Sequence, residues 1–245
     1  TIVSGLALFS STLMADNLKV ALAAEPTSMD PHYQNLTINN SFATQVFNAL
    51  VLQDVNQNLI PGLASSWTPV DENTWEFKLR PGVKFHNGAS FSAEDVVATM
   101  KRAANVPNSP SSFGTFIKGK TFEIIDDLTL HVSTEKPYPF TPNDMSRVAI
   151  IDSAFENATT EDFNTGKATF GTGPFTFSKW MPGDLIEIKR NDNYWGGAVE
   201  WDSITIRPIK DGTTRTAALI SGDVDFIERV SPADIPNLEK RDGIK

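Results

Sequence analysis

The sequence predicts a mixed fold, in which helices and strands follow one another without a regular βαβ repeat. Some segments alternate apolar and polar side chains at period two, as strands do, for example TWEFKLR at 74–80 and LIEIKR at 185–190. Others have apolar side chains at helical spacing, for example 92–104. The helical segments are too many for a pure β-sandwich, so we expect an α/β or α+β protein.

The composition is that of an ordinary globular protein with an acidic balance. The 245 residues are 40% hydrophobic and 21% charged, carry a net charge of -9 and include no cysteine. Acidity argues against nucleic acid as a partner, because nucleic acid demands a basic footprint, and also against an anionic membrane surface. The lack of cysteine excludes disulfides and thiolate metal sites.

The first fifteen residues, TIVSGLALFSSTLMA, resemble the apolar core and cleavage zone of a secretory signal. Their densest apolar part, Ile2 to Phe9, is too short to span a bilayer. A basic start is absent, and Leu13 is a weaker fit than a small residue at its position before the cut. An ordinary buried helix or strand is the alternative. We predict cleavage after Ala15, so that the mature chain begins near Asp16.

The start of the mature chain is expected to form a strand, a loop and a helix. The apolar run 17–26 ends at a proline and is interpreted as a strand. Asp30-Pro31 marks a turn in the loop that follows. Residues 38–52 have apolar side chains on one face at helical spacing, so they are predicted to form a helix.

The clearest local structure lies between residues 74 and 104. After the strand at 74–80, VKFH at 83–86 is predicted as a strand that enters a tight hairpin, because Asn87-Gly88 follows it. Ser92 is the expected cap of a helix that continues to 104, with acids in its first turn and bases in its last.

The later elements follow from the same two patterns. Alternation and turn residues predict strands, and a glycine stops the last predicted helix. In chain order the elements are two strands in 122–133, a short helix near 152–163 within an irregular stretch, a hairpin of 175–180 and 185–190, a strand at 203–209, a helix at 213–222 and a short strand at 223–227.

No motif in the sequence indicates catalysis, a metal site or a cofactor. The histidines, His32, His86 and His131, are not at metal-ligand spacing, and neither H-E-x-x-H nor G-x-S-x-G occurs. The acids are scattered and sit mostly at turns. A hydrolytic carboxylate pair remains a distant alternative, because sequence does not show spatial pairing.

The stretch GTGPF at 171–175 raises the question of a phosphate loop. It lacks the third glycine and the following helix of the dinucleotide fingerprint, and it also lacks the Gly-Lys-Ser/Thr ending. Gly171, Gly173 and Pro174 are therefore interpreted as a structural turn that enters a strand. In the loop NDNYWGG, Tyr194 and Trp195 are candidates to line a ligand cleft, although loop aromatics more often anchor packing.

Five segments in order resemble one known family. They are AAEPTSMDPH (23–32), LASSWTPVDENTWEFKLRPGVKFHNGASFSAEDVVATMKRA (63–103), FGTGPFTFSKWMPGD (170–184), IKRNDNYWGG (188–197) and ITIRPIKDGTTRTAALISGDVDF (204–226). Together the segments resemble the extracytoplasmic solute-binding proteins, family 5, of peptide- and nickel-type ABC importers. That family is the three-domain class of periplasmic binding proteins. The resemblance covers nearly the whole chain, about residues 16–240.

The resemblance implies a bilobal fold with an inserted α+β domain. It places 16–48 and 168–245 in the first lobe and 49–167 in the inserted domain. Family members are about twice as long, so the opposing lobe, which reads much of the ligand, is expected to be missing from this chain. In this family the GTGPF turn marks the return to the first lobe.

The resemblance also implies a function. We expect a periplasmic binding component of an ABC importer, without enzymatic activity, that delivers small peptides to membrane permease subunits and is a monomer when full length. The absence of cysteine favours a form without a lipid anchor. Nickel chelates, glutathione or oligosaccharides are alternative ligands, and a sensory or chaperone-like binding protein is the alternative class. Candidate ligand-binding residues are Tyr33, Asn39, Asn40, Ser41 and Arg147, of which Arg147 would pair with a carboxylate.

Overall fold

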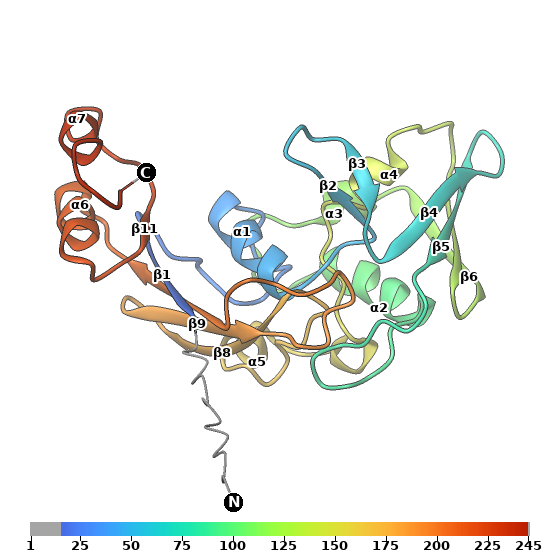
Figure 1. The fold of residues 1–245 in the computed structure, drawn as a ribbon. Coiled ribbons are helices and arrows are strands. Elements are labelled where there is room, and N and C mark those ends of the chain that lie inside the picture. The colour runs from blue at the N-terminus through green and yellow to red at the C-terminus, as the bar shows by residue number, and fades with distance from the viewer. Residues whose placement is uncertain (1–15, 245) are drawn as a thin grey trace, which may run out of the picture.

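The computed structural model describes residues 16–244, so the predicted signal segment 1–15 lies outside the described residues. Within them the strands form three sheets, and the two larger sheets lie at opposite ends of an elongated molecule (Figure 1). No helix in this described part is both long and apolar enough to cross a bilayer.

A five-stranded sheet occupies one end, in the order β11-β1-β10-β9-β8. The first strand of the chain lies inside this sheet, parallel to both of its neighbours, whereas β8, β9 and β10 pair antiparallel. The predicted strands and the 175–190 hairpin are confirmed. The bounds are β1 Asn17–Leu22, β8 Phe175–Met181, β9 Leu185–Arg190, β10 Ser203–Pro208 and β11 Phe226–Ile227.

Helix α1, Thr37–Val46, packs on this sheet through Phe42 and Val46, which contact a core that includes Ile186 and Ile188. The predicted helix at 38–52 is too long. The chain becomes extended at Phe47, and Val51–Gln53 forms strand β2, paired with β3, Leu59–Pro61. The apolar residues at the end of the predicted helix are buried in a second core as part of an extended segment, so tertiary packing outweighs the local helical pattern.

A four-stranded antiparallel sheet, in the order β4-β5-β7-β6, occupies the other end. The predicted strands at 74–80 and in 122–133 are confirmed, while the outer strand β4 was not predicted. The bounds are β4 Ala64–Pro69, β5 Thr74–Leu79, β6 Lys120–Asp126 and β7 Thr129–Thr134.

Helix α2, Ala93–Ala103, packs near β6 and begins where the sequence predicts. The Asp95 carboxylate accepts a hydrogen bond from the Ser92 backbone N–H at 2.8 Å, which satisfies one of the free donors at the start of a helix. The predicted strand at 83–86 is wrong. Asn87-Gly88 does form a turn, but the pairing stops at a single bridge between Lys84 and Ser90. The two arms are joined by single backbone hydrogen bonds, from Phe85 to Ala89 at 2.9 Å and from Phe91 to Val83 at 3.0 Å, and both phenylalanine side chains are buried in the core, so the segment is a loop held by packing rather than a strand.

The single short helix predicted near 152–163 is two separate turns. Asp152 caps the first, η1, and Thr159 caps the second, α5, each through its side chain. Helix α6 ends at Gly222, which has φ 78°, as its glycine predicts. The helices not yet given bounds are α3 Gly114–Ile117, α4 Thr141–Asp144, η1 Ser153–Phe155, α5 Thr160–Asn164, α6 Gly212–Ser221 and α7 Ile235–Leu238.

The two larger sheets have separate apolar cores. One core gathers buried side chains between Leu50 and Ile150, and the other joins α1 to β8 and β9. The exact domain boundaries, with 49–167 as an inserted domain between 16–48 and 168–245, stay a prediction.

Candidate ligand-binding cleft

A hollow of about 510 Å³ lies between helix α1 on the side of the five-stranded sheet and strands β2 and β3 on the side of the four-stranded sheet. Helix α1 contributes one side, and β2, β3 and the segment that follows α4 contribute the other. Figure 1 shows how these elements are arranged. Pro174, from the GTGPF turn, and Tyr194, from the β9–β10 loop, also line it. The cleft is therefore built from segments far apart in the sequence.

The charge of the cleft differs from that of the whole chain. Among the described residues that line it, Arg147 is the one charged side chain, although the chain carries a net charge of -9. Four amides share the lining: Asn40, Gln45, Asn48 and Gln53. Such a surface suits a ligand with a carboxylate and further polar groups, because a guanidinium binds carboxylates through charge-assisted hydrogen bonds.

Arg147 is exposed on a fixed backbone. Its N–H donates to the Asp144 carbonyl at 3.0 Å, in the turn after α4, and its sequence neighbour Val148 is fully buried. The preceding Ser146 hydroxyl accepts from Gln53 Nε2 at 3.1 Å. Within residues 16–244 the Arg147 guanidinium makes neither an ion pair nor a hydrogen bond, so it is free to bind a ligand.

The cleft brings together two of the five residues that the sequence proposed, Asn40 and Arg147. Asn40 Nδ2 donates to Asn35 Oδ1 at 2.8 Å. Asn39 is buried instead and bonds Thr27, with its Nδ2 3.0 Å from Thr27 Oγ1.

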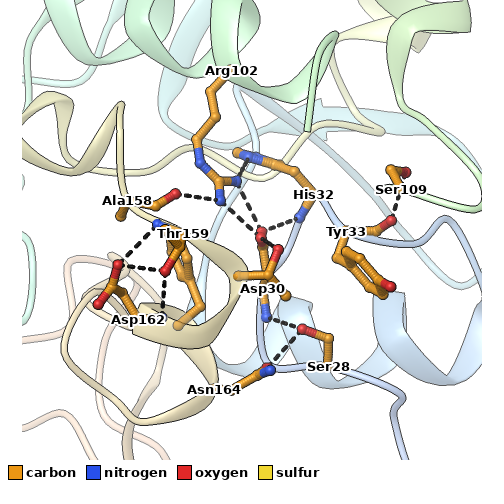
Figure 2. A network of polar contacts seen from close by, with 12 residues as sticks. Ser28, Asp30, His32, Tyr33, Arg102, Ser109, Ala158, Thr159, Asp162 and Asn164 are labelled. Atoms are coloured by element: carbon orange, nitrogen blue, oxygen red, sulfur yellow. Dashed lines mark hydrogen bonds and ion pairs between the residues drawn. The ribbon is translucent and has the colours of Figure 1, made fainter. Parts of the chain in front are cut away.

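Ser41 lines a separate hollow of about 540 Å³ between α1 and the five-stranded sheet. Residues 39, 40 and 41 point in three directions because successive helical residues are about 100° apart. Tyr33 does not line the cleft; its carbonyl accepts from Ser109 Oγ at 2.7 Å (Figure 2). For these three residues a role in the cleft has no geometric support.

The GTGPF turn packs directly against the end of α1. The Gly173 N–H donates to the Val46 carbonyl at 2.9 Å, and a Cβ on Gly173 would lie 2.6 Å from the Val46 carbonyl carbon. A Cβ on Gly171 would overlap the same carbonyl. Neither glycine is among those with positive φ, so close backbone approach is what requires them here.

Sequence reasoning did not propose Asn48 or Gln53 as cleft residues. Asn48 is buried, and its Oδ1 accepts from Trp195 Nε1 at 2.9 Å and from Thr172 Oγ1 at 3.1 Å. Asn48 falls within the predicted helix at 38–52 and Gln53 directly follows it, and no local pattern marked either residue. The Tyr194–Trp195 pair was visible as an aromatic pair in a loop, but only the fold places Tyr194 in the cleft.

Beside the cleft, a buried polar network joins the loop after β1 to α2 and α5 (Figure 2). Arg102 NH1 and NH2 donate to the two Asp30 carboxylate oxygens at 2.9 and 2.8 Å. Thr160 Oγ1 donates to Asp30 at 2.8 Å, and Arg102 also donates to the Ala158 carbonyl at 3.1 Å. The guanidinium lies over the Phe163 ring, 4.5 Å from its centroid.

His32 completes the network as a neutral imidazole. Its Nε2 lies 2.7 Å from the Ala149 carbonyl and its Nδ1 lies 3.0 Å from Arg102 NH1, so Nε2 carries the proton and Nδ1 accepts. Burial, together with the adjacent Arg102 charge, lowers the pKa of His32 from 6.5 to about 4. Burial alone would raise the pKa of Asp30, but its hydrogen bonds and charge contact with Arg102 outweigh that effect and lower it.

These acids and histidines do not assemble a metal site. The described residues contain no group of three or more His, Cys, Asp or Glu side chains that could hold a metal ion. In the described part of the chain, Arg102 and its partners bind one another, and the cleft presents Arg147 and amides.

Comparison with known proteins identifies relatives of this architecture. The family model of bacterial extracellular solute-binding proteins, family 5, matches residues 58–245. The glutathione-binding protein GsiB of Pectobacterium atrosepticum is 31% identical over 232 residues, which are 94% of this chain and 45% of that protein. The chain thus spans about half the length of the curated relatives that it matches.

Two solved structures are similar in fold. The oligopeptide-binding protein AppA of Bacillus subtilis, in complex with a nonapeptide, has a TM-score of 0.84 at 27% identity, covering 94% of this chain and 47% of that one. A nickel ABC transporter protein of Bacillus halodurans has a TM-score of 0.78 at 31% identity, covering 93% of this chain and 46% of that one. The chain belongs to the bacterial extracellular solute-binding proteins of family 5.

Proposed function

We propose that this protein is the substrate-binding component of an ABC importer, and that it captures peptides and delivers them to a membrane permease. The observation that carries the proposal is the cleft in which the exposed Arg147 guanidinium is the one charged side chain among the described lining residues. A peptide supplies a carboxylate for that guanidinium and amide groups for the surrounding carboxamides. We infer that binding involves no covalent chemistry and that the protein acts as a monomer.

Family membership supports this proposal, and the relatives indicate alternatives within it. GsiB is named for glutathione, AppA was solved with a nonapeptide, and the Bacillus halodurans protein is named for nickel. Glutathione also carries carboxylates, and a nickel chelate can present one, so Arg147 would serve either ligand. A bare nickel ion is the poorer match, because the described residues hold no cluster of metal ligands. Neutral oligosaccharides lack a carboxylate and give Arg147 no ionic partner.

We infer a periplasmic location, with the segment 1–15 acting as a signal that is cleaved after Ala15. The family is one of extracellular binding proteins, and the segment is uncharged, apolar and ends in a small residue. A sensory or chaperone-like role without transport is the alternative class. If a deletion strain loses uptake of the bound solute, the result supports transport. If uptake is unchanged, the result favours the sensory or chaperone-like role.

The test is calorimetric titration of the protein produced from its own gene. The probes are reduced glutathione, the tripeptide Ala-Phe-Ala, the same tripeptide with an amidated C-terminus, nickel with histidine, and maltotriose. We expect a carboxylate-bearing probe to bind. Replacing Arg147 with methionine should weaken that binding by about tenfold or more, since a hydrogen bond to a charged group contributes roughly 1.5–3 kcal/mol.

The matched control is Arg207→Met, because Arg207 is an exposed arginine on β10 that does not line the cleft. It should bind every probe as the wild type does. The amidated tripeptide should bind wild type and Arg147→Met with similar, weak affinity. The proposal is wrong if none of the carboxylate-bearing probes binds, or if Arg147→Met binds them all as tightly as the wild type.

A further inference from the structure

The β9–β10 loop, NDNYWGG at 191–197, is ordered by bonds that start at Asn191. Its backbone N–H donates to the Pro174 carbonyl at 2.9 Å, and its Nδ2 donates to the Gly173 carbonyl at 3.0 Å. The Tyr194 N–H then donates to the Asn191 carbonyl at 3.1 Å. The loop is thereby tied to the GTGPF turn, and Tyr194 is directed toward the cleft.

Trp195 anchors the loop from the other side. Its indole N–H donates to the buried Asn48 Oδ1 at 2.9 Å. The Arg80 guanidinium lies over the indole, 4.5 Å from the ring centroid, and is itself bonded to the Gly62 carbonyl through Nε at 3.2 Å. The indole is therefore fixed on one edge by a hydrogen bond and on one face by a cation. Trp195 does not line the cleft, so its contacts serve to position its neighbour.

Gly196 provides the space that the Tyr194 ring occupies. A Cβ at Gly196 would lie 2.5 Å from Tyr194 Cε1 and 2.7 Å from its Cζ, so no other residue fits there without moving the ring. The Tyr194 ring also packs on Trp195, with 5.3 Å between the ring centroids and 56° between the ring planes. The ring is half-buried and forms part of the cleft surface, so its position is set before any ligand arrives.

We propose that Tyr194 contacts the ligand, as an aromatic wall that selects solutes with a planar amide or aromatic face within reach of Arg147. This inference rests on the proposed function, because it assigns a second contact in the same cleft. Arg147 fixes the charged end of the ligand, and the phenol supplies a flat apolar face with a hydroxyl at its tip. Trp195 and Gly196 are positioning residues that do not touch the ligand.

The test compares Tyr194→Ala, Tyr194→Phe and Gly196→Ala with the wild type produced from its own gene, in titrations with Ala-Phe-Ala and with reduced glutathione. Tyr194→Ala should weaken binding by about tenfold or more, as loss of a well-packed tyrosine contact does. Tyr194→Phe retains the ring, so its loss should be smaller, about threefold to tenfold. Gly196→Ala keeps the tyrosine but displaces it, and should lose affinity comparably to Tyr194→Ala.

Tyr138→Ala is the control, because the Tyr138 ring packs against the Lys120 ammonium and does not line the cleft, so it should leave both affinities unchanged. Fluorotyrosine labelling gives a readout that does not depend on loss of function. The chain has three tyrosines, so the ¹⁹F signal of Tyr194 is the one that Tyr194→Phe lacks, and it should shift on titration of the wild type.

The outcomes separate the two proposals. If the wild type binds a probe and Arg147→Met weakens that binding, while Tyr194→Ala binds normally and the Tyr194 signal does not move, this inference is overturned and the proposed function stands. A wild type that binds none of the carboxylate-bearing probes, nickel with histidine included, overturns both. A shift of the Tyr194 ¹⁹F signal supports the ligand contact, even if Tyr194→Ala is less stable, when Tyr194→Ala and Gly196→Ala lose more affinity than Tyr194→Phe.

Discussion

Replacing Arg102 with methionine removes the cation of the buried network in Figure 2 and keeps most of the apolar volume of the side chain. The Arg102 and Asp30 side chains are 6% and 0% exposed, so neither charge has water as an alternative partner. In the variant the Asp30 carboxylate retains the Thr160 hydroxyl and the His32 backbone N–H as donors but has no counter-charge.

Breaking a buried, hydrogen-bonded ion pair by removing one partner costs about 3–5 kcal/mol, because it leaves an uncompensated buried charge. For a chain of this size each kcal/mol shifts the melting temperature by about 2–4 °C, so the variant should melt about 6–20 °C below the wild type. Calorimetry and urea unfolding should both report the loss.

A double variant separates loss of the pair from loss of packing. Asp30→Asn alone leaves the guanidinium buried opposite an amide, whereas Asp30→Asn with Arg102→Met removes both charges. The double variant should be more stable than the sum of the two single losses predicts, by about 1 kcal/mol or more. Lys101→Met on the neighbouring exposed position is the control. A loss below about 1 kcal/mol for Arg102→Met, or strict additivity, would refute the assignment of a desolvated pair.

Two further predictions concern pH and the N-terminus. The pKa of His32 is lowered to about 4 in the folded chain, so the unfolded chain binds a proton first as pH falls below 6.5, and stability should decline by up to roughly 1.4 kcal/mol per pH unit between about 6.5 and 4. His32→Gln should flatten that slope relative to the wild type and leave the smaller contribution of His86, because burial also lowers the pKa of His86. An unchanged slope would contradict this prediction. Mass spectrometry of a periplasmic extract should find Asp16 as the first residue, and a mature protein that retains Ile2 to Phe9 would disprove cleavage after Ala15.

Local sequence patterns could predict elements whose structure is decided by near neighbours. The strand at 74–79 follows period-two alternation, and helix α2 begins after Ser92 and carries its acids and bases where the helix dipole favours them. The same dipole argument explained Arg102 only as a positive charge in the last turn of the helix. Its burial against Asp30 depends on a loop some seventy residues away, so no window around α2 contains that information.

The second half of the helix predicted at 38–52 was wrong for a related reason. Residues 47–52 continue the helical spacing of apolar side chains. Leu50 and Val51 nevertheless pack in the core of the four-stranded sheet, and they reach it because the backbone is extended from Phe47 on. The cleft was out of reach of sequence reasoning because α1, β2, the turn at 171–175 and the loop at 191–197 meet only in the folded chain. Even within α1 the candidates at 39, 40 and 41 differ in environment, since the helix turns each to a different side.

The contacts around the cleft determine how its variants can be interpreted. Gly173 bonds to Val46, Trp195 bonds to Asn48, and Gln53 bonds to Ser146, so each segment that carries a lining side chain is fixed by a bond to another segment. Neither the Arg147 guanidinium nor the Tyr194 ring supplies any of those bonds. Removing the Arg147 side chain therefore leaves the supporting bonds of the cleft in place, and a change in affinity reports a lost ligand contact. Removing the Tyr194 ring also removes its packing on Trp195, so Tyr194→Phe, which keeps the ring, and the ¹⁹F signal of the wild type are needed to separate a lost ligand contact from a displaced loop. Replacing Trp195 or Gly196 has a different meaning, because the Tyr194 ring is still present and only its position changes.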